Sequence, residues 1–215
     1  MTQPILVTGF EPFGGEAVNP SAQVARALHG RRIGGAAVVG IVLPCAFGEA
    51  VHMLRDALAT HRPQLVLALG QAGGRGDLSL ERVAINLDDA RIADNRGAQP
   101  IDEPVQAGGP AAYFTTLPVK AMIAALRQAG HPASLSHSAG TFVCNHVFYG
   151  LQHLLAGQGS VRSGFMHLPY LPEQAERHAG APGLALDTMV HGVAAALAAA
   201  LVTVKDTKLS EGTLD

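Results

Sequence analysis

The sequence predicts an α/β fold in which a sheet is covered by helices on both faces. Short β-branched or apolar runs alternate with stretches of helical periodicity along most of the chain. Nearly half of the 215 residues (48%) are hydrophobic, which suffices for one well-filled core in a domain of this size. Because no repeat or low-complexity linker divides the chain, residues 1–215 are expected to form a single domain.

The predicted elements follow in chain order. Strands are expected over residues 5–8, 37–43, 65–69, 78–86, 133–136 and 164–168, and helices over 21–28, 48–60, 119–128, 142–156 and 184–204. Pro20 and Ser21 open the first helix with a capping residue, while Gly30 and Gly130 close the first and third helices. Residues 88–118 are long, polar and rich in Gly and Pro, which indicates a functional loop, and residues 205–215 are expected to be a frayed tail.

The composition makes several classes of protein poor matches for this chain. A formal net charge of -2 gives no electrostatic reason to expect a nucleic-acid or acidic-membrane partner. Two cysteines in the whole chain favour a reducing cytoplasm over a secreted disulfide scaffold. The N-terminus lacks a basic region and is not expected to be a signal peptide. The long apolar stretch near the C-terminus contains Asp187 and His191, so it is interpreted as a packed helix and not as a membrane span.

Three further patterns do not match the sites that they first suggest. The segment GFEPFGGE has Gly15 and Glu16 where a phosphate loop needs Lys and Ser or Thr. GQAGGRG at residues 70–76 is not a dinucleotide fingerprint either, although both segments allow a ligand close to the backbone at strand ends. His146 and His153 could share a helix face, yet no metal-ligand motif accompanies them, so they are interpreted as packing or surface residues and no metal site is expected.

Cys144 lies in SAGTFVCNHVFYG, where a strand is expected to end and a helix to begin. If Thr141 caps that helix, Cys144 falls in its first turn, where unpaired N–H groups and the helix dipole stabilise a thiolate. The same residue also fits the apolar spacing of the helix and could be an ordinary core cysteine.

A thiol nucleophile needs a base, and the base needs an orienting acid. His146 is two positions from Cys144 and points away on a helix, whereas His167 ends a predicted strand and can face a cleft. Glu81 shares the apolar face of its predicted strand with Val83 and Ile85, which is costly for a carboxylate unless a partner such as a histidine N–H compensates. A buried imidazole for His167 and an ion pair of Glu81 with an arginine such as Arg91 are the structural alternatives.

Together these segments resemble the pyroglutamyl peptidase I (pyrrolidone-carboxylate peptidase) family of cysteine peptidases. The match covers residues 6–191 through GFEPFGG…NPS, GQAGGR, ERVAINLDDARIADN, SAGTFVCN and GFMHLPY. The resemblance implies a three-layer αβα fold with a mixed, mostly parallel sheet, similar to phosphorylase/hydrolase-like proteins. It implies a catalytic triad of Glu81, Cys144 and His167, no cofactor, and a dimer or tetramer. IADN in place of the more usual IPDN, and the extra Cys45 in LPCAF, are departures that leave the triad untouched.

The substrate implied is a peptide with an N-terminal pyroglutamyl residue, whose flat lactam has no basic amine. We expect an apolar pocket built from Phe10, Phe13 and Phe142, with hydrogen bonds from groups near Gln71. Arg91 is expected either to assist the backbone N–H of the nucleophile at the oxyanion or to pair with a loop carboxylate. The rival functions are a nucleoside phosphorylase-like enzyme and a non-catalytic binder of lactam-ended peptides.

Overall fold

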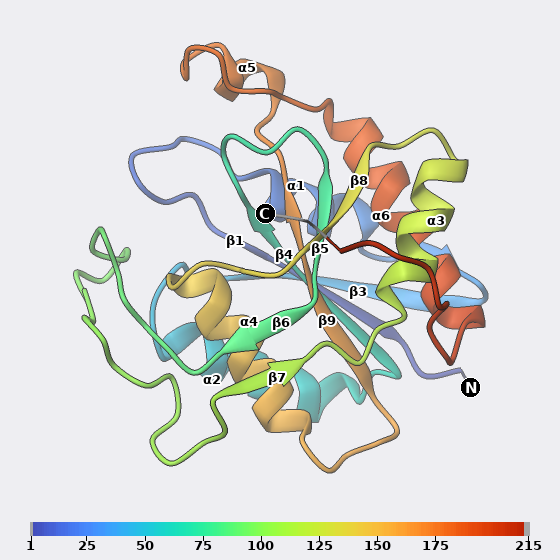
Figure 1. The fold of residues 1–215 in the computed structure, drawn as a ribbon, viewed down its shortest axis with the longest axis horizontal. Coiled ribbons are helices and arrows are strands. Elements are labelled where there is room, and N and C mark those ends of the chain that lie inside the picture. The colour runs from blue at the N-terminus through green and yellow to red at the C-terminus, as the bar shows by residue number, and fades with distance from the viewer. Residues whose placement is uncertain (1, 213–215) are drawn as a thin grey trace.

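The computed structural model describes residues 2–212 and has a seven-stranded sheet at its centre (Figure 1). The sheet order is β2-β3-β1-β4-β9-β5-β8, with parallel pairing throughout its middle and antiparallel pairing of β2 with β3 and of β5 with β9. The strands are β1 (Ile5–Phe10), β2 (Arg32–Ile33), β3 (Ala36–Leu43), β4 (Leu65–Gln71), β5 (Leu78–Glu81), β8 (Ala133–Ser136) and β9 (Arg162–Leu168). The expected mixed, mostly parallel sheet is confirmed.

Two hydrophobic layers cover the sheet, as alternation of side chains along buried strands requires. One face packs against α1 (Pro20–Leu28), α3 (Val119–Gln128) and α6 (Leu186–Val202). The other packs against α2 (Glu49–His61) and α4 (Val143–Leu155). A further, short helix beside these layers is α5 (Pro172–Ala175). The three-layer αβα arrangement is therefore confirmed.

The predicted strand over residues 78–86 is wrong as a single element. Its first half is β5, and its second half is β6 (Val83–Ile85), which pairs with β7 (Ala112–Phe114) in a separate two-stranded sheet. The break falls at Arg82, whose N–H donates to the Ser136 carbonyl while its own carbonyl accepts from Thr115 N–H. The apolar alternation changes phase at this point, from Leu78 and Leu80 to Val83 and Ile85. The expectation that Glu81 shares one strand face with Val83 and Ile85 is therefore wrong, and the buried residue of β6 is Ala84.

The caps of two helices differ from the expectation. Asn19, one residue before the expected Pro20–Ser21 start, caps α1 and accepts the Ser21 N–H at 3.0 Å. At α4 the N-cap is Phe142 and not Thr141, whose hydroxyl instead donates to the Asp89 carbonyl at 2.7 Å. Each helix still begins within one residue of its expected position.

The C-terminal segment contacts the start of α3 from a distance in sequence. The Asp206 carboxylate accepts the N–H groups of Lys120 and Ala121, which supplies a cap that α3 lacks locally. Arg127 and Glu211 form a two-bond ion pair with its closest approach at 2.7 Å.

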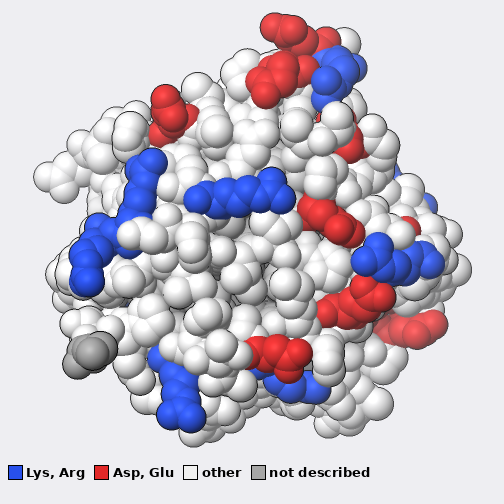
Figure 2. Space-filling model, turned by 180° about the vertical axis from the view of Figure 1, so that it is seen from behind, with Lys and Arg blue, Asp and Glu red and all other residues white. Residues whose placement is uncertain are grey.

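The surface seen from behind shows acidic and basic side chains interspersed around a wide neutral area (Figure 2). Residues 2–212 include no helix long and apolar enough to cross a membrane.

Candidate active site

Glu81 and His167 lie on the same face of the sheet, although 86 residues separate them. Antiparallel pairing of β5 with β9 places Ser79 opposite His167 and Glu81 opposite Phe165. Phe165 packs in the layer shared with α2 and α4, so alternation puts Glu81 and His167 on that face too. The register therefore brings the predicted acid and base together.

The two side chains form a short hydrogen bond in a dry environment. His167 Nδ1 lies 2.7 Å from Glu81 Oε1, with 5% of the histidine side chain and none of the glutamate side chain exposed. Because an ionised carboxylate can only accept, the proton lies on Nδ1. This assignment leaves Nε2 of the neutral ring as a base, and within residues 2–212 that atom has no hydrogen-bond partner.

Cys144 reaches the same place from α4. It is the second residue of that helix, so its expected position in the first turn is confirmed. Its sulfur lies against Gly70, where a Cβ atom would come within 2.8 Å of Sγ. Since Gly70 is in register with His167 on the neighbouring strand, the thiol faces the strand position beside the base. A glycine is required at residue 70 because any side chain would displace the sulfur.

The electrostatic environment shifts the pKa of the acid and the pKa of the thiol in opposite directions. Burial alone raises the pKa of Glu81, but the hydrogen bond from His167, the charge of that ring when it is protonated, and the hydrogen bond from Arg75 hold this pKa below its ordinary value. Burial, followed by the charges of Cys45 and Glu81, raises the pKa of the Cys144 thiol, and Arg75 opposes this rise. The lowered pKa favours an ionised acid at neutral pH, and the raised pKa favours a protonated thiol, which opposes the thiolate stabilisation expected at the helix terminus.

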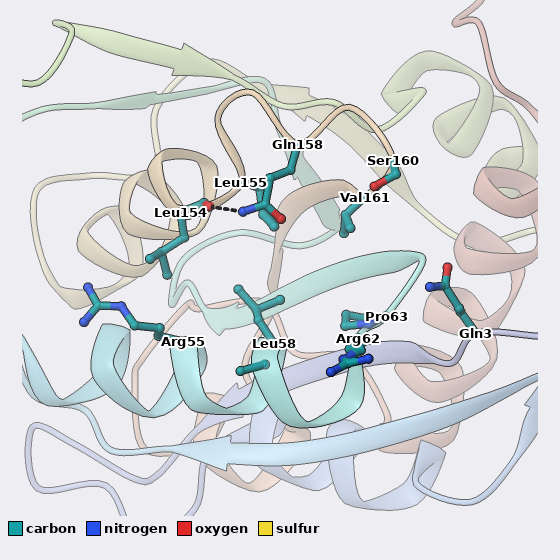
Figure 3. A pocket seen from close by; sticks show the side chains of 11 residues that line it. Gln3, Arg55, Leu58, Arg62, Pro63, Leu154, Leu155, Gln158, Ser160 and Val161 are labelled. Carbon is teal, nitrogen blue, oxygen red and sulfur yellow. Dashed lines mark hydrogen bonds between the residues drawn. The ribbon is translucent and has the colours of Figure 1, made fainter.

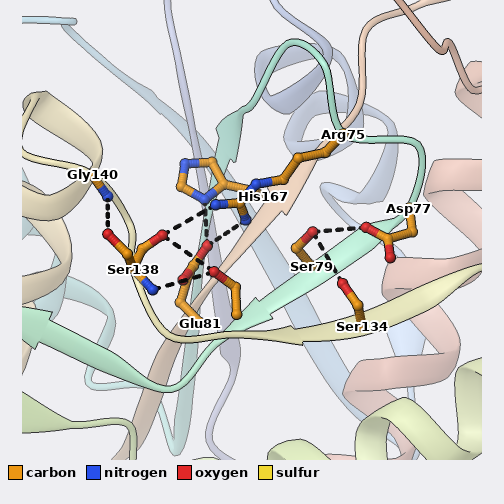
Figure 4. A network of polar contacts seen from close by, with 9 residues as sticks. Arg75, Asp77, Ser79, Glu81, Ser134, Ser138, Gly140 and His167 are labelled. Atoms are coloured by element: carbon orange, nitrogen blue, oxygen red, sulfur yellow. Dashed lines mark hydrogen bonds and ion pairs between the residues drawn. The ribbon is translucent and has the colours of Figure 1, made fainter. Parts of the chain in front are cut away.

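Arg75 is the polar residue that sequence reasoning missed. Its Nη1 donates to Glu81 Oε1 at 2.7 Å and its Nη2 donates to the Ser138 carbonyl at 3.1 Å (Figure 4). The arginine that pairs with Glu81 is thus Arg75, and the alternative pairing with Arg91 is wrong. The segment GQAGGRG contained the signal, but only its glycines were interpreted.

Aromatic rings gather at the start of α4, the helix that carries the thiol. Phe142, the N-cap of the helix that carries Cys144, lies 5.9 Å from Phe13 and 5.4 Å from Phe47 between ring centroids. Phe13 and Phe142 are partly exposed and can contact a ligand, whereas Phe10 is buried against Phe165 at 6.5 Å. Phe47 was not predicted for this group.

The sheet opens between β1 and β4 at their carboxyl ends. These strands stay in register only as far as Thr8 and Ala68, and the Phe10 N–H turns to the Ser21 hydroxyl at 3.0 Å. The Ala72 N–H donates to the Leu168 carbonyl of β9. Because backbone groups alternate in direction along a strand, the N–H and C=O of Gln71 point the other way, toward the opening. Backbone groups of Gln71 can therefore bind a ligand in the crevice where α/β sheets typically bind one.

The side chain of Gln71 is directed elsewhere. Its Oε1 accepts from Gln174 Nε2 at 3.0 Å, and Gln174 also donates to Glu16 Oε2 at 3.0 Å. Glu16 binds His178 and Arg177 as well, each at 2.7 Å. The Gly-rich loop that carries Phe13 is in this way attached to the segment around α5.

Arg91 is exposed, and no hydrogen bond or ion pair joins its side chain to another of residues 2–212. The alternative that it pairs with a loop carboxylate finds no support in this arrangement.

A second histidine–acid pair lies two residues along α4 from the thiol. His146 Nδ1 is 2.7 Å from Asp88 Oδ2, and His146 Nε2 accepts the Gly48 N–H at 3.0 Å. The ring also packs edge-on against Phe47, with centroids 5.3 Å apart. Both ring nitrogens are used, as the packing interpretation of His146 implies.

A cavity elsewhere in the molecule does not contain this chemistry. A cavity of about 530 Å³ lies between α2 and α4 at the amino ends of the strands (Figure 3), and it is lined by Arg55, Leu58, Arg62, Leu154 and Val161 among others. None of the predicted site residues lines it. Across residues 2–212, no cluster of three or more His, Cys, Asp or Glu side chains is arranged to hold a metal ion.

Comparison with known proteins gives a consistent result. The profile of the pyroglutamyl peptidase family matches residues 3–203. The chain is 59% identical over 212 residues to the pyrrolidone-carboxylate peptidase of Cupriavidus taiwanensis, with 98% of both chains covered. It is 56% identical over 208 residues to that of Erwinia tasmaniensis, with 97% of both chains covered. The crystal structure of pyroglutamyl peptidase I from Bacillus amyloliquefaciens superposes with a TM-score of 0.95 at 44% identity and covers 98% of this chain and 100% of that one. This chain therefore belongs to the pyroglutamyl peptidase family.

Proposed function

We propose that the chain is a cysteine exopeptidase that hydrolyses the bond after an N-terminal pyroglutamyl residue, with Cys144, His167 and Glu81 as its catalytic residues. The observation that carries this proposal is the convergence of the three side chains on one face of the sheet, with a histidine whose Nδ1 is held by a buried acid. Family membership supports the substrate class.

The reaction follows from the protonation states described above. His167 Nε2 takes the proton of the Cys144 thiol as the sulfur attacks the pyroglutamyl carbonyl, because the raised thiol pKa disfavours a free thiolate at rest. The Cys144 N–H at the start of α4 donates to the developing oxyanion, a contribution of about 3 kcal/mol for one such donor. His167 then protonates the departing peptide amine, and water hydrolyses the thioester. Glu81 holds the ring in the required tautomer throughout.

The pocket suits a neutral lactam. Phe13 and Phe142 can hold the ring between them, and the free N–H and C=O of Gln71 match the C=O and N–H of a cyclic amide. We retain Phe10 in the proposed pocket as a buried residue packed against Phe165. We retain Arg91 as a proposed second donor for the oxyanion because its exposed side chain is free to move.

The wider setting is also part of the proposal. Residues 1–215 form a single catalytic domain that needs no cofactor, acts in the cytoplasm and assembles as a dimer or tetramer. Two free cysteines, one of them the nucleophile, suit a reducing compartment. Exposed apolar side chains at Phe114, Val202 and Val204 offer surface for self-association.

The test is hydrolysis of a pyroglutamyl coumarin amide by the wild type, Cys144→Ser and Cys45→Ser. We expect Cys144→Ser to lose at least about 10⁴-fold in kcat/KM and Cys45→Ser to stay within about tenfold of wild type. The reverse pattern would assign the reaction to the other thiol.

Substrate choice is tested by comparing pyroglutamyl, prolyl and glutamyl amides, of which only the first should be cleaved well. Binding of the pyroglutamyl amide without turnover would favour a non-catalytic binder, and phosphate-dependent nucleoside cleavage would favour a phosphorylase. Family membership favours neither alternative.

A further inference from the structure

Arg75 occupies a position that the proposed mechanism leaves without a role. Its guanidinium donates to the same Oε1 atom of Glu81 that accepts from His167 Nδ1, and both distances are 2.7 Å. Glu81 has no exposed surface, and its other oxygen, Oε2, is buried without a hydrogen-bond partner. One carboxylate oxygen therefore supports both a permanent cation and the base (Figure 4).

The resting site would be unbalanced without that cation. A neutral His167 donates a hydrogen bond to Glu81 but brings no positive charge, so Arg75 is the full charge that compensates the buried carboxylate. The Arg75 side chain is about one-third exposed (32%), and its charged end reaches inward. We propose that Arg75 is a positioning residue that keeps the Glu81–His167 pair as an ionised acid and a neutral base, a role that rests on the proposed function.

The location of Arg75 also links the acid to the segment that carries the nucleophile. It lies in the turn between β4 and β5, where Gly73 packs against Tyr170 so closely that a Cβ atom would lie 2.2 Å from the phenol. The second Arg75 bond, to the Ser138 carbonyl, holds the loop that leads into α4. One side chain thus connects the β4–β5 turn, the acid and the loop before Cys144.

The charged groups around the Glu81–His167 pair determine in which direction the loss of Arg75 shifts the pH dependence of activity. The titratable or charged groups around the pair are Arg75, Cys144 on α4 with Cys45 beyond it, Asp77 before β5, and His137 after β8. Removing the guanidinium takes away positive charge beside the pair, so the pair binds its next proton more tightly whichever partner receives it. Protonation inactivates the base. The acid limb of kcat/KM should therefore move to higher pH when Arg75 is lost.

The experiment compares Arg75→Met, Arg75→Lys and the control Arg82→Met. Arg82 is the next arginine along the chain and forms no ion pair with another of residues 2–212. We expect Arg75→Met to move the acid limb of kcat/KM to higher pH by about one unit. This shift is at the lower end of the range for loss of an ion pair, because the site is partly solvated. Arg75→Lys retains the charge and should restore a limb close to wild type. Arg82→Met should leave the limb in place.

A second measurement is independent of turnover. An NMR titration of the His167 ring, assigned with His167→Asn, should show the same rise of the midpoint in Arg75→Met. A folded Arg75→Met with an unchanged midpoint overturns the role, as does an equal shift in Arg82→Met or a lysine variant that behaves like methionine. If Arg75→Met does not fold, Arg75→Gln, which can still donate to Ser138, takes its place with the same expected shift. Failure of the wild type to cleave a pyroglutamyl amide would reject the proposed function, while the titration would still decide the role of Arg75.

Discussion

The two buried histidine–acid pairs beside Cys144 are nearly alike in geometry and differ in what they can do. Both join Nδ1 to a carboxylate oxygen at 2.7 Å, and in both the carboxylate is almost fully buried. His146 Nε2 already accepts the Gly48 N–H, whereas His167 Nε2 has no partner among residues 2–212. The difference teaches that an acid–histidine pair indicates a base only when the second ring nitrogen is free.

The cations around the two pairs differ as well. Glu81 is shared with Arg75, but no arginine or lysine forms an ion pair with Asp88 among residues 2–212. The His146 ring instead packs against Phe47 and joins α4 to the start of α2 and to the loop after β6. The pair built from Asp88 and His146 is therefore a structural connection.

The largest expected effect is the loss of activity when the catalytic histidine is replaced, and it should appear for His167 and not for His146. Asparagine can replace the Nδ1–H donor of either histidine but supplies no Nε2 base. We expect His167→Asn to lower kcat/KM by at least about 10⁴-fold with folding intact, and His146→Asn to lower it by no more than about tenfold. Steady-state hydrolysis of a pyroglutamyl amide measures both. Equal losses in the two variants would remove the distinction between the pairs.

The acids provide the second comparison. We expect Glu81→Gln to reduce turnover by about 10²- to 10⁴-fold with folding intact, because the amide no longer stabilises the imidazolium formed during the reaction. Asp88→Asn should leave turnover within about tenfold but lower the free energy of unfolding by about 2 kcal/mol, since a buried pair loses its charge. Urea denaturation and kinetics on the same samples separate these outcomes. Normal turnover in Glu81→Gln would exclude this residue from the mechanism.

Glu16 and His178 form a third and more exposed pair, which extends the comparison to the pH dependence of stability. The hydrogen bonds from His178 and Gln174, opposed by burial and aided by Arg177, lower the pKa of Glu16 from 4.5 to about 2. A lowered pKa in the folded state stabilises the protein above about pH 4.5, and this contribution is lost as the pH falls toward 2.

Between pH 6 and pH 3 the loss should be about 1 to 2 kcal/mol, reduced by the exposure of Arg177 and His178. Denaturation of wild type and Glu16→Gln at both pH values measures it as a difference that is larger at pH 6. A constant difference would show that Glu16 is not ionised through this pairing.

Part of the fold could be predicted because it depends on local periodicity. The alternation of short strands with helices predicted the layered sheet, and the expected start of a helix near residue 142 placed Cys144 in the first turn even though its cap was misassigned. The break at Arg82 was missed because each half alternates by itself, and the change of phase between them was overlooked: Leu78 and Leu80 pack in one core layer and Ala84 in the other. The family resemblance, and not periodicity, selected Glu81 and His167 as partners.

The sequence by itself determined which residue types were available for the chemistry and, in the elements that were predicted whole, which side chains face the core. Only the tertiary structure decided which of them meet: Glu81 with His167 across 86 residues, Asp88 with His146 across 58, and Arg75 on the oxygen that the base also uses. The physical reason is that strand register and helix packing position these groups, and both depend on the whole core and not on any one segment.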